Sequence, residues 1–216
     1  MSGTHSDIEG TPVQLDQEWA NALTHAIAAI SAIGLGGYTV WVASGVSVGL
    51  TIACAAYILT VVGTFAFSTL SHSIHRQPIL NTLRAWDQAM IYLMITGTYT
   101  PIAFRFAPDT VRDPLLVAIW IAALAGFWFK VAKQHRINSV GIVSYLLLGW
   151  LPAIPLVDSV PRELVIAMIA GGVLYSIGVC FLVNDNKFRY AHALWHLFVM
   201  AAATTHWLGI HWYVVG

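Results

Sequence analysis

Five polar residues within apolar stretches have the types and spacing to form a metal-dependent site. His192 and His196 are four residues apart in AHALWHLFVM, and Ser68 and His72 have the same spacing in FSTLSH. On a helix, such pairs lie one above the other on one face. Asp87 follows at the start of WDQAMIYLMITGTYTP. Three imidazoles with a carboxylate or water nearby are the donors of a catalytic zinc site that keeps one open position.

The chemistry of such a site is hydrolytic. Zinc lowers the pKa of its bound water and so supplies a hydroxide nucleophile at neutral pH. Asp87 would hold that water as a general base, or orient it through a hydrogen bond. The Ser68 hydroxyl would bind the same water or a substrate oxygen. We therefore predict zinc ligands at His72, His192 and His196, and catalytic roles for Asp87 and Ser68.

Each residue also has a structural alternative. Asp87 could cap the third helix by accepting a backbone N–H. Ser68 could bond to the carbonyl four residues earlier, and His72 could be a solvated or capping residue at a helix end. Two histidines on one apolar face of the last span are harder to explain structurally. The remaining histidines are expected to have ordinary roles: His5, His25, His75, His135, His206 and His211.

The elements that must position these residues are membrane helices. The chain has 58% hydrophobic and 9% charged residues, and a mean hydropathy of +0.72, which is too apolar for a soluble domain. Ten Lys and Arg balance ten Asp and Glu. The basic residues lie singly between apolar runs, so no nucleic acid partner is expected. Cys54 and Cys180 lie in separate apolar runs, and neither a disulfide framework nor a cysteine metal site is indicated.

Seven apolar runs are long enough to cross a bilayer, which requires about 20 residues each. They cover residues 22–43, 47–71, 87–106, 114–133, 138–157, 162–183 and 190–214. The short break ASGV, after Trp41, separates the first two runs. The fold class expected is therefore an all-α membrane protein, a seven-helix transmembrane domain over residues 22–216. A polar, acidic segment, residues 1–21, precedes it.

Loop charges predict the orientation, because Lys and Arg accumulate on the cytoplasmic side. With the N-terminus inside and the C-terminus outside, three basic residues fall in outer loops: Arg105, Arg112 and Arg162. Seven fall in inner loops: Arg76, Arg84, Lys130, Lys133, Arg136, Lys187 and Arg189. This topology brings the end of the second span and the starts of the third and seventh to one depth near the cytoplasmic surface.

Motifs along nearly the whole chain resemble a known family. They are EWANALTHAIAAI, FSTLSH, RAWDQAMIYLMITGTYTP, GWLPAIP, GGVLYSIGV and HALWHLFVMAA. In this order they resemble the haemolysin III proteins of bacteria, which group with the progestin and adipoQ receptors, including the adiponectin receptors. One departure is Ser71 directly before His72, where the family more often has an aromatic residue. It affects no proposed ligand.

The resemblance implies seven helices, a cytoplasmic N-terminus and a zinc ion near the inner leaflet. The matching ligands are His72, His192 and His196, with Asp87 contacting the metal through water and Ser68 close by. It also implies a multi-pass protein of the bacterial cytoplasmic membrane. Animal members look like ceramidases, while the bacterial members are named for cytolysis and linked to membrane-lipid homeostasis.

Several functions remain open at this point. The first is a zinc-dependent hydrolase of an amide or ester in a membrane lipid, with a fatty acyl substrate. The second is a receptor or stress sensor in which zinc is structural. The third is a pore or cytolysin, and the fourth is a haem protein with histidine axial ligands. The Asp and Ser companions of the histidines favour the hydrolase over the haem protein.

Overall fold

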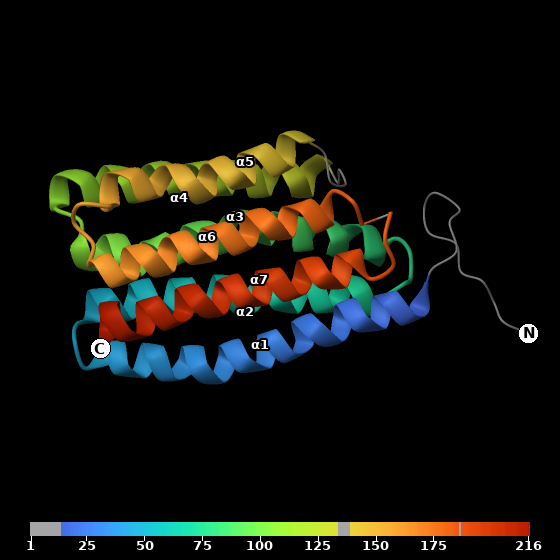
Figure 1. Ribbon diagram of the computed structural model, residues 1–216, viewed down its shortest axis with the longest axis horizontal. Coiled ribbons are helices and arrows are strands. Elements are labelled where there is room, and N and C mark those ends of the chain that lie inside the picture. Colours follow the sequence, from blue (N-terminus) through green and yellow to red (C-terminus); the bar gives the residue numbers. More distant parts are fainter. Residues whose placement is uncertain (1–13, 134–138, 186) are drawn as a thin grey trace, which may run out of the picture.

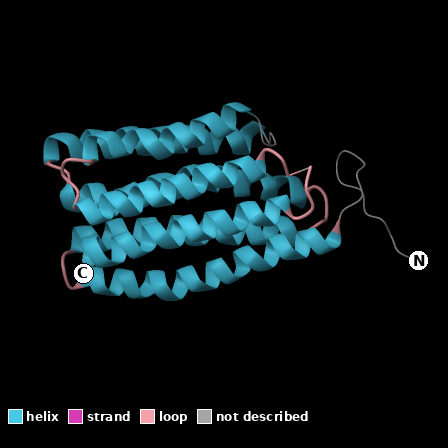
Figure 2. Ribbon diagram, in the orientation of Figure 1, coloured by secondary structure: helices cyan, strands magenta, loops and turns pink. Residues whose placement is uncertain are grey.

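The computed structural model describes residues 14–133, 139–185 and 187–216. Every regular element in these ranges is helical, and the helices run side by side as one bundle (Figures 1 and 2). The seven main helices are α1 (Leu15–Ser44), α2 (Val48–Ser73), α3 (Ile79–Phe106), α4 (Asp109–Lys133), α5 (Ser139–Trp150), α6 (Arg162–Leu182) and α7 (Ala191–Ile210). Two short helical turns, η1 (Leu151–Leu156) and η2 (His211–Val215), extend α5 and α7. The prediction of an all-α, seven-helix membrane protein is confirmed.

The helices follow the predicted spans, but three of them begin earlier, and α4 begins at Asp109, five residues before its predicted span. α1 begins at Leu15, seven residues before the predicted span, and α3 begins at Ile79, eight residues before Asp87. Within the described residues, five helices are long and apolar enough by themselves to cross a membrane: α1, α2, α4, α6 and the α7–η2 unit. The other two are α3, which carries charged residues along its length, and α5, a shorter apolar helix that continues into η1.

Proline and serine set several of the helix boundaries. Ser47 caps α2, because its side chain accepts a hydrogen bond from the Leu50 backbone N–H at 3.1 Å. Pro152 and Pro155 lie in η1, where the chain continues α5 as a tighter 3₁₀ turn. Proline lacks the N–H that an α-helix interior needs, which explains this change. α5 and η1 together still cover the predicted fifth span.

The order of packing brings distant parts of the chain together. α1, α2, α3 and α4 pack successively, α6 packs on α7, and α7 returns to pack against α1. α1 begins at one end of the bundle and the chain ends at the other (Figure 1). The end of α2 and the starts of α1, α3 and α7 therefore meet at the same end of the bundle, called the α1-start end below.

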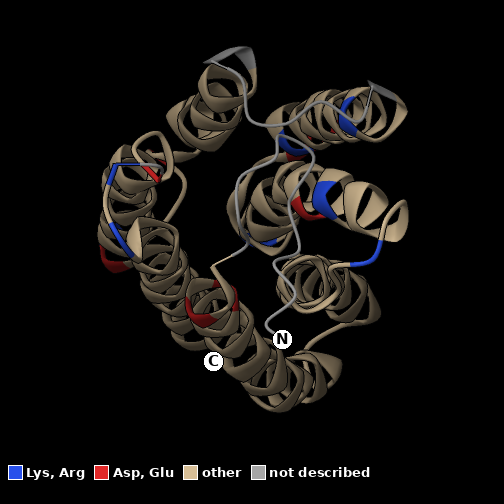
Figure 3. Cartoon of the chain, turned by 90° about the vertical axis from the view of Figure 1, so that its right-hand side faces the viewer, with Lys and Arg blue, Asp and Glu red and all other residues tan. Residues whose placement is uncertain are grey.

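Basic residues are distributed unequally between the two ends. Arg76, Lys187 and Arg189 lie in loops at the α1-start end, which faces the viewer in Figure 3, and Arg84 and Lys133 lie near this end in α3 and α4. Three of the described basic residues lie at the opposite end: Arg105, Arg112 and Arg162. Arg136 lies outside the described residues. The prediction that Lys130 lies in an inner loop is wrong, because Lys130 lies within α4 and is buried. The direction of insertion stays a prediction from this charge asymmetry.

Candidate metal centre

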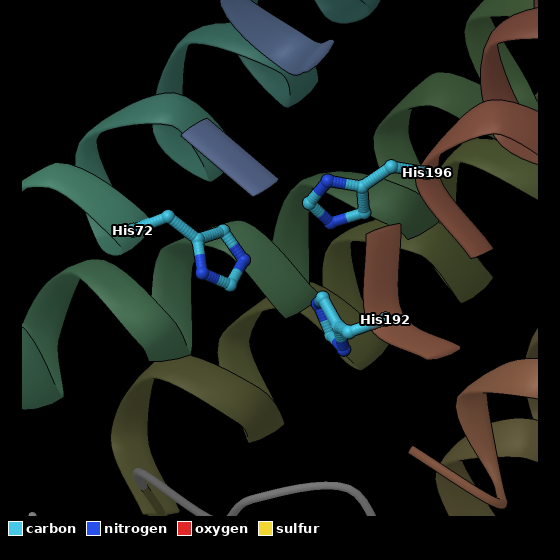
Figure 4. A group of neighbouring side chains, drawn as sticks. All are labelled: His72, His192 and His196. Carbon is cyan, nitrogen blue, oxygen red and sulfur yellow. The ribbon is translucent and has the colours of Figure 1, made fainter. Parts of the chain in front are cut away.

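Three histidines meet at the α1-start end of the bundle. His72 comes from the penultimate position of α2, and His192 and His196 come from the first two turns of α7. One ring nitrogen from each lies within 4.8 Å of the others. The ring centroids are 4.7 to 5.1 Å apart, and Figure 4 shows the rings turned toward a common space. The helical spacing and the predicted topology thus bring these residues together.

Each ring has an oxygen beside its Nδ1 atom. His72 Nδ1 lies 2.6 Å from Glu18 Oε2, and His192 Nδ1 lies 3.4 Å from Asp185 Oδ2. His196 Nδ1 lies 3.2 Å from the Asn21 carbonyl oxygen. An oxygen acceptor at Nδ1 holds the proton there in the neutral ring and leaves Nε2 with a lone pair. This is the usual environment of histidines that bind a metal.

The donor set fits a metal such as zinc. His72 Nε2 is buried and has no hydrogen-bond partner among the described residues, so its lone pair is available. In a tetrahedral zinc site with Zn–N bonds of about 2.0 Å, ligand nitrogens are roughly 3.4 Å apart. The three ligand nitrogens would therefore have to approach one another by up to about 1.4 Å from their 4.8 Å limit. Small side-chain rotations are enough for such a change.

Asp87 lies well inside α3. The N-cap position of α3 is Pro78, so the alternative that Asp87 caps this helix is wrong, as is its predicted place in the first turn. Its carboxylate lines the same cavity as His192 and His196. Ser71 Oγ donates a hydrogen bond of 2.9 Å to Asp87 Oδ2. The residue that departs from the family pattern therefore orients the candidate base.

Ser68 also faces this space. Its hydroxyl is buried and makes no hydrogen bond of standard geometry with any described residue, although it lies near the Asp87 carboxylate. The alternative of a bond to the carbonyl four residues earlier is therefore not what the structure contains. A hydroxyl in this position can donate to a ligand in the cavity.

His25 was expected to be an ordinary interfacial residue, and this expectation is wrong. It lies ten residues inside α1, is 3% exposed, and its ring stacks on that of His196 at a centroid distance of 3.6 Å. Neither of its ring nitrogens has a partner among the described residues. His25 thus supports one face of a candidate ligand. By contrast, His211 bonds to Thr39 near the far end of the bundle, at 3.1 Å.

A polar stripe on α1 was a signal that sequence reasoning missed. Glu18, Asn21 and His25 are spaced i, i+3 and i+7, which places them on one helical face. Glu18 contacts His72, while Asn21 and His25 both contact His196. The stripe lies inside EWANALTHAIAAI, the first of the motifs that resemble the haemolysin III proteins. A search for polar residues at helical spacing that extended back from the predicted first span, residues 22–43, into the polar segment before it would have found the stripe.

A cavity of about 420 Å³ opens beside the three histidines, between α3, α5, α6 and α7. On α6 its lining runs from Val165 to Leu182, which corresponds to about 25 Å along the helix axis. The walls are mainly aliphatic and aromatic side chains, and Asp87, Ser68, His192 and His196 lie together at the α1-start end, while His206 lines the cavity farther along α7. An elongated apolar space with a polar end suits a molecule with a hydrocarbon chain.

The contact between Glu18 and His72 gives a first prediction. Replacing Glu18 with Ala removes the acceptor at His72 Nδ1, and losing such a partner typically weakens metal affinity about 10- to 100-fold. Zinc affinity is measured by competition with a chromophoric chelator. Asp16→Ala is the matched control, because Asp16 is an exposed acid one half-turn away that pairs with Arg189. Equal zinc affinity of Glu18→Ala and the wild type would show that this contact does not support a metal ligand.

Comparison with known proteins places the chain in a family. The sequence profile described as Haemolysin-III related matches residues 13–207. The Hemolysin-3 of Bacillus cereus is 33% identical over 207 residues, which cover 92% of each chain. The Hemolysin-3 homolog of Bacillus subtilis (strain 168) is 31% identical over 205 residues, covering 93% of this chain and 96% of that protein.

A more distant relative is animal. The human Monocyte to macrophage differentiation factor is 26% identical over 155 residues, covering 69% of this chain and 65% of that protein. The profile match covers six of the seven main helices and α7 as far as residue 207, including both segments that supply the three histidines. The predicted resemblance is thereby confirmed, and the chain belongs to the haemolysin-III related family of multi-pass membrane proteins.

Proposed function

We propose that the protein is a zinc-dependent hydrolase that cleaves an amide or ester bond of an acyl lipid within the membrane. One observation carries this proposal: three histidine nitrogens lie close together, and His192, His196 and the half-buried Asp87 carboxylate line one end of an elongated apolar cavity. Metal ligands, a candidate base and a space for an acyl chain are thus contiguous.

The chain's own residues divide the chemistry between them. Zinc held by His72, His192 and His196 would act as a Lewis acid and make water nucleophilic near neutral pH. Asp87 Oδ2 accepts the hydrogen bond from Ser71 Oγ. Asp87 Oδ1 is left to take the proton of the attacking water and pass it to the leaving group. Ser68 Oγ donates a hydrogen bond to the carbonyl oxygen of the scissile bond. The apolar walls orient the acyl chain and exclude bulk water.

The positions of the basic residues support a location of this reaction on the cytoplasmic side of the membrane. Five described basic residues outside the cavity lie at or near the end of the bundle that carries the histidines, against three at the other end, and such residues accumulate on the cytoplasmic side. We infer that the N-terminus is cytoplasmic, that the site lies near the inner leaflet, and that the protein resides in the bacterial cytoplasmic membrane. There the acyl chains of lipids and cytoplasmic water are both within reach.

The test is hydrolysis by the purified full-length protein. Lipids with the same fluorescent acyl chain, joined by an amide in one set and an ester in the other, are supplied in neutral detergent micelles. We expect release of free fatty acid from one set, loss of this release after treatment with a zinc chelator, and recovery on adding zinc. No release from either set by zinc-loaded protein, across lipids with neutral and anionic head groups, would refute the hydrolase.

Two other functions lead to different results. A receptor or sensor with a structural zinc needs four protein ligands, whereas Asp87 and the unbonded Ser68 hydroxyl leave the cavity side of the cluster suited to water. A pore is suggested by the name of the Bacillus cereus relative. Conductance in lipid bilayers that survives His196→Ala would favour the pore.

A further inference from the structure

Lys130 is a buried cation in the wall of the cavity. It lies in the last turn of α4 and is 2% exposed, although lysine almost never is fully buried unless it is paired. Its Nζ donates a hydrogen bond of 3.1 Å to Gln88 Oε1 and lies 6.0 Å from the centre of the Tyr145 ring. Both neighbours are uncharged.

No acidic side chain in the described part of the chain lies within ion-pair distance of this ammonium. An ammonium has three N–H donors, and Gln88 accepts one of them. Burying a charge without a counter-charge is strongly unfavourable in a protein interior. Within a membrane span, such a residue usually marks a site for a ligand.

The position of Lys130 connects it to the candidate metal centre. Gln88, its hydrogen-bond acceptor, directly follows Asp87 on α3, and all three residues line the same cavity. The Gln88 backbone is itself fixed, because Tyr145 donates a hydrogen bond of 2.9 Å to its carbonyl oxygen. The ammonium is therefore held next to the polar end of the cavity, on the α3 side of the three histidines.

We propose that Lys130 binds the anionic group of an acyl lipid in this cavity, with Gln88 holding the ammonium in place. Where the site hydrolyses lipids, as proposed above, its substrates are then anionic acyl lipids and not neutral ones such as ceramide. This second step depends on the proposed hydrolase, whereas the binding of an anionic lipid does not. A phosphate or a carboxylate would both provide the missing charge.

The cavity favours a lipid over a small free anion. Its walls beyond the polar end are apolar side chains of α3, α5 and α6, among them Ile95, Leu146 and Val165. These walls are as apolar as the surrounding lipid and so accommodate a hydrocarbon chain, while a free anion gains nothing from this surface. A molecule with a charge at one end and an acyl chain at the other satisfies both regions.

Binding is tested on the full-length protein in neutral detergent micelles, by native mass spectrometry and by the shift in thermal unfolding temperature. The probes are phosphatidylglycerol, diacylglycerol with the same chains, sodium oleate and inorganic phosphate. We expect at least tenfold tighter binding of phosphatidylglycerol or oleate than of diacylglycerol, and no binding of inorganic phosphate. Comparison of phosphatidylglycerol with oleate identifies phosphate or carboxylate as the preferred anion.

Variants then assign this preference to one residue. Lys130→Met should abolish the preference and leave the unfolding temperature without lipid unchanged or higher, because it removes an unpaired buried charge. Lys130→Arg should keep most of the preference. Lys187→Met is the matched control, since Lys187 is an exposed lysine at the same end of the bundle, and it should behave as the wild type.

Three results would overturn the proposal. They are equal binding of anionic and neutral lipids by the wild type, a preference that survives in Lys130→Met, and tight binding of inorganic phosphate alone. The first of these needs no variant and so does not depend on the folding of Lys130→Met. Because binding is measured without turnover, the proposal can hold even where no lipid is hydrolysed, and can fail where hydrolysis is observed.

Discussion

Replacing Asp87 with Asn is expected to lower lipid hydrolysis by about 1000-fold while leaving the bound metal in place. The expected magnitude follows from general acid–base catalysis, which typically contributes 10²- to 10⁴-fold. Asn has nearly the same shape as Asp, and its side-chain oxygen can still accept the bond from Ser71 Oγ. It cannot take a proton from water. The change therefore removes the proposed base without removing any of the three histidines.

Two measurements on the same preparation check this result. Release of free fatty acid gives the turnover, and elemental analysis gives the zinc content per chain. Asp113→Asn is the control, because Asp113 is an exposed acid near the start of α4, at the opposite end of the bundle, and it should keep full turnover. If Asp87→Asn hydrolyses lipid at the wild-type rate, Asp87 is not the base and the proposed proton transfer is wrong.

Replacing His196 with Ala is expected to remove the metal and the stability that the metal provides. The wild type should contain about one zinc per chain, and the variant almost none. A ligand at a thousand times its Kd stabilises a protein by about 4 kcal/mol, and 1 kcal/mol corresponds to roughly 2–4 °C for a domain of this size. Chelation should therefore lower the unfolding temperature of the wild type by about 10 °C.

The sensitive readout is the response to the chelator. Removing a buried ring that stacks on His25 destabilises the protein by itself, but the unfolding temperature of His196→Ala should not fall further on chelation. His211→Ala is the matched control, since His211 bonds to Thr39 near the far end of the bundle, and it should stay sensitive to the chelator. A variant His196→Ala with full zinc content would place the metal elsewhere.

Much of the architecture could be predicted from the sequence. Runs of about 20 apolar residues define the helices, because the bilayer requires that length and an internally bonded backbone. The i, i+4 spacing of His192 and His196 places both on one face of α7. The alternation of seven spans then brings this face to the depth of His72, so the three-histidine cluster follows from local spacing and topology together.

The rest depends on contacts between helices that local sequence does not specify. The hydrophobic pattern starts α3 near Asp87, because Asn81, Thr82 and Arg84 interrupt the apolar residues before it, yet the helix continues back to Ile79. Ser71 had no predicted role, and its bond to Asp87 exists because α2 and α3 pack side by side. Lys130 was assigned to a loop by its charge, although packing buries it in the cavity wall.

The most direct test of the metal centre is zinc K-edge X-ray absorption on the purified protein. If His72, His192 and His196 bind one zinc and leave a fourth position open, the spectrum will contain three nitrogen neighbours from imidazole rings at about 2.0 Å and one oxygen neighbour. A zinc with sulfur neighbours, or with fewer than three imidazoles, would contradict a three-histidine site and with it the proposed hydrolase.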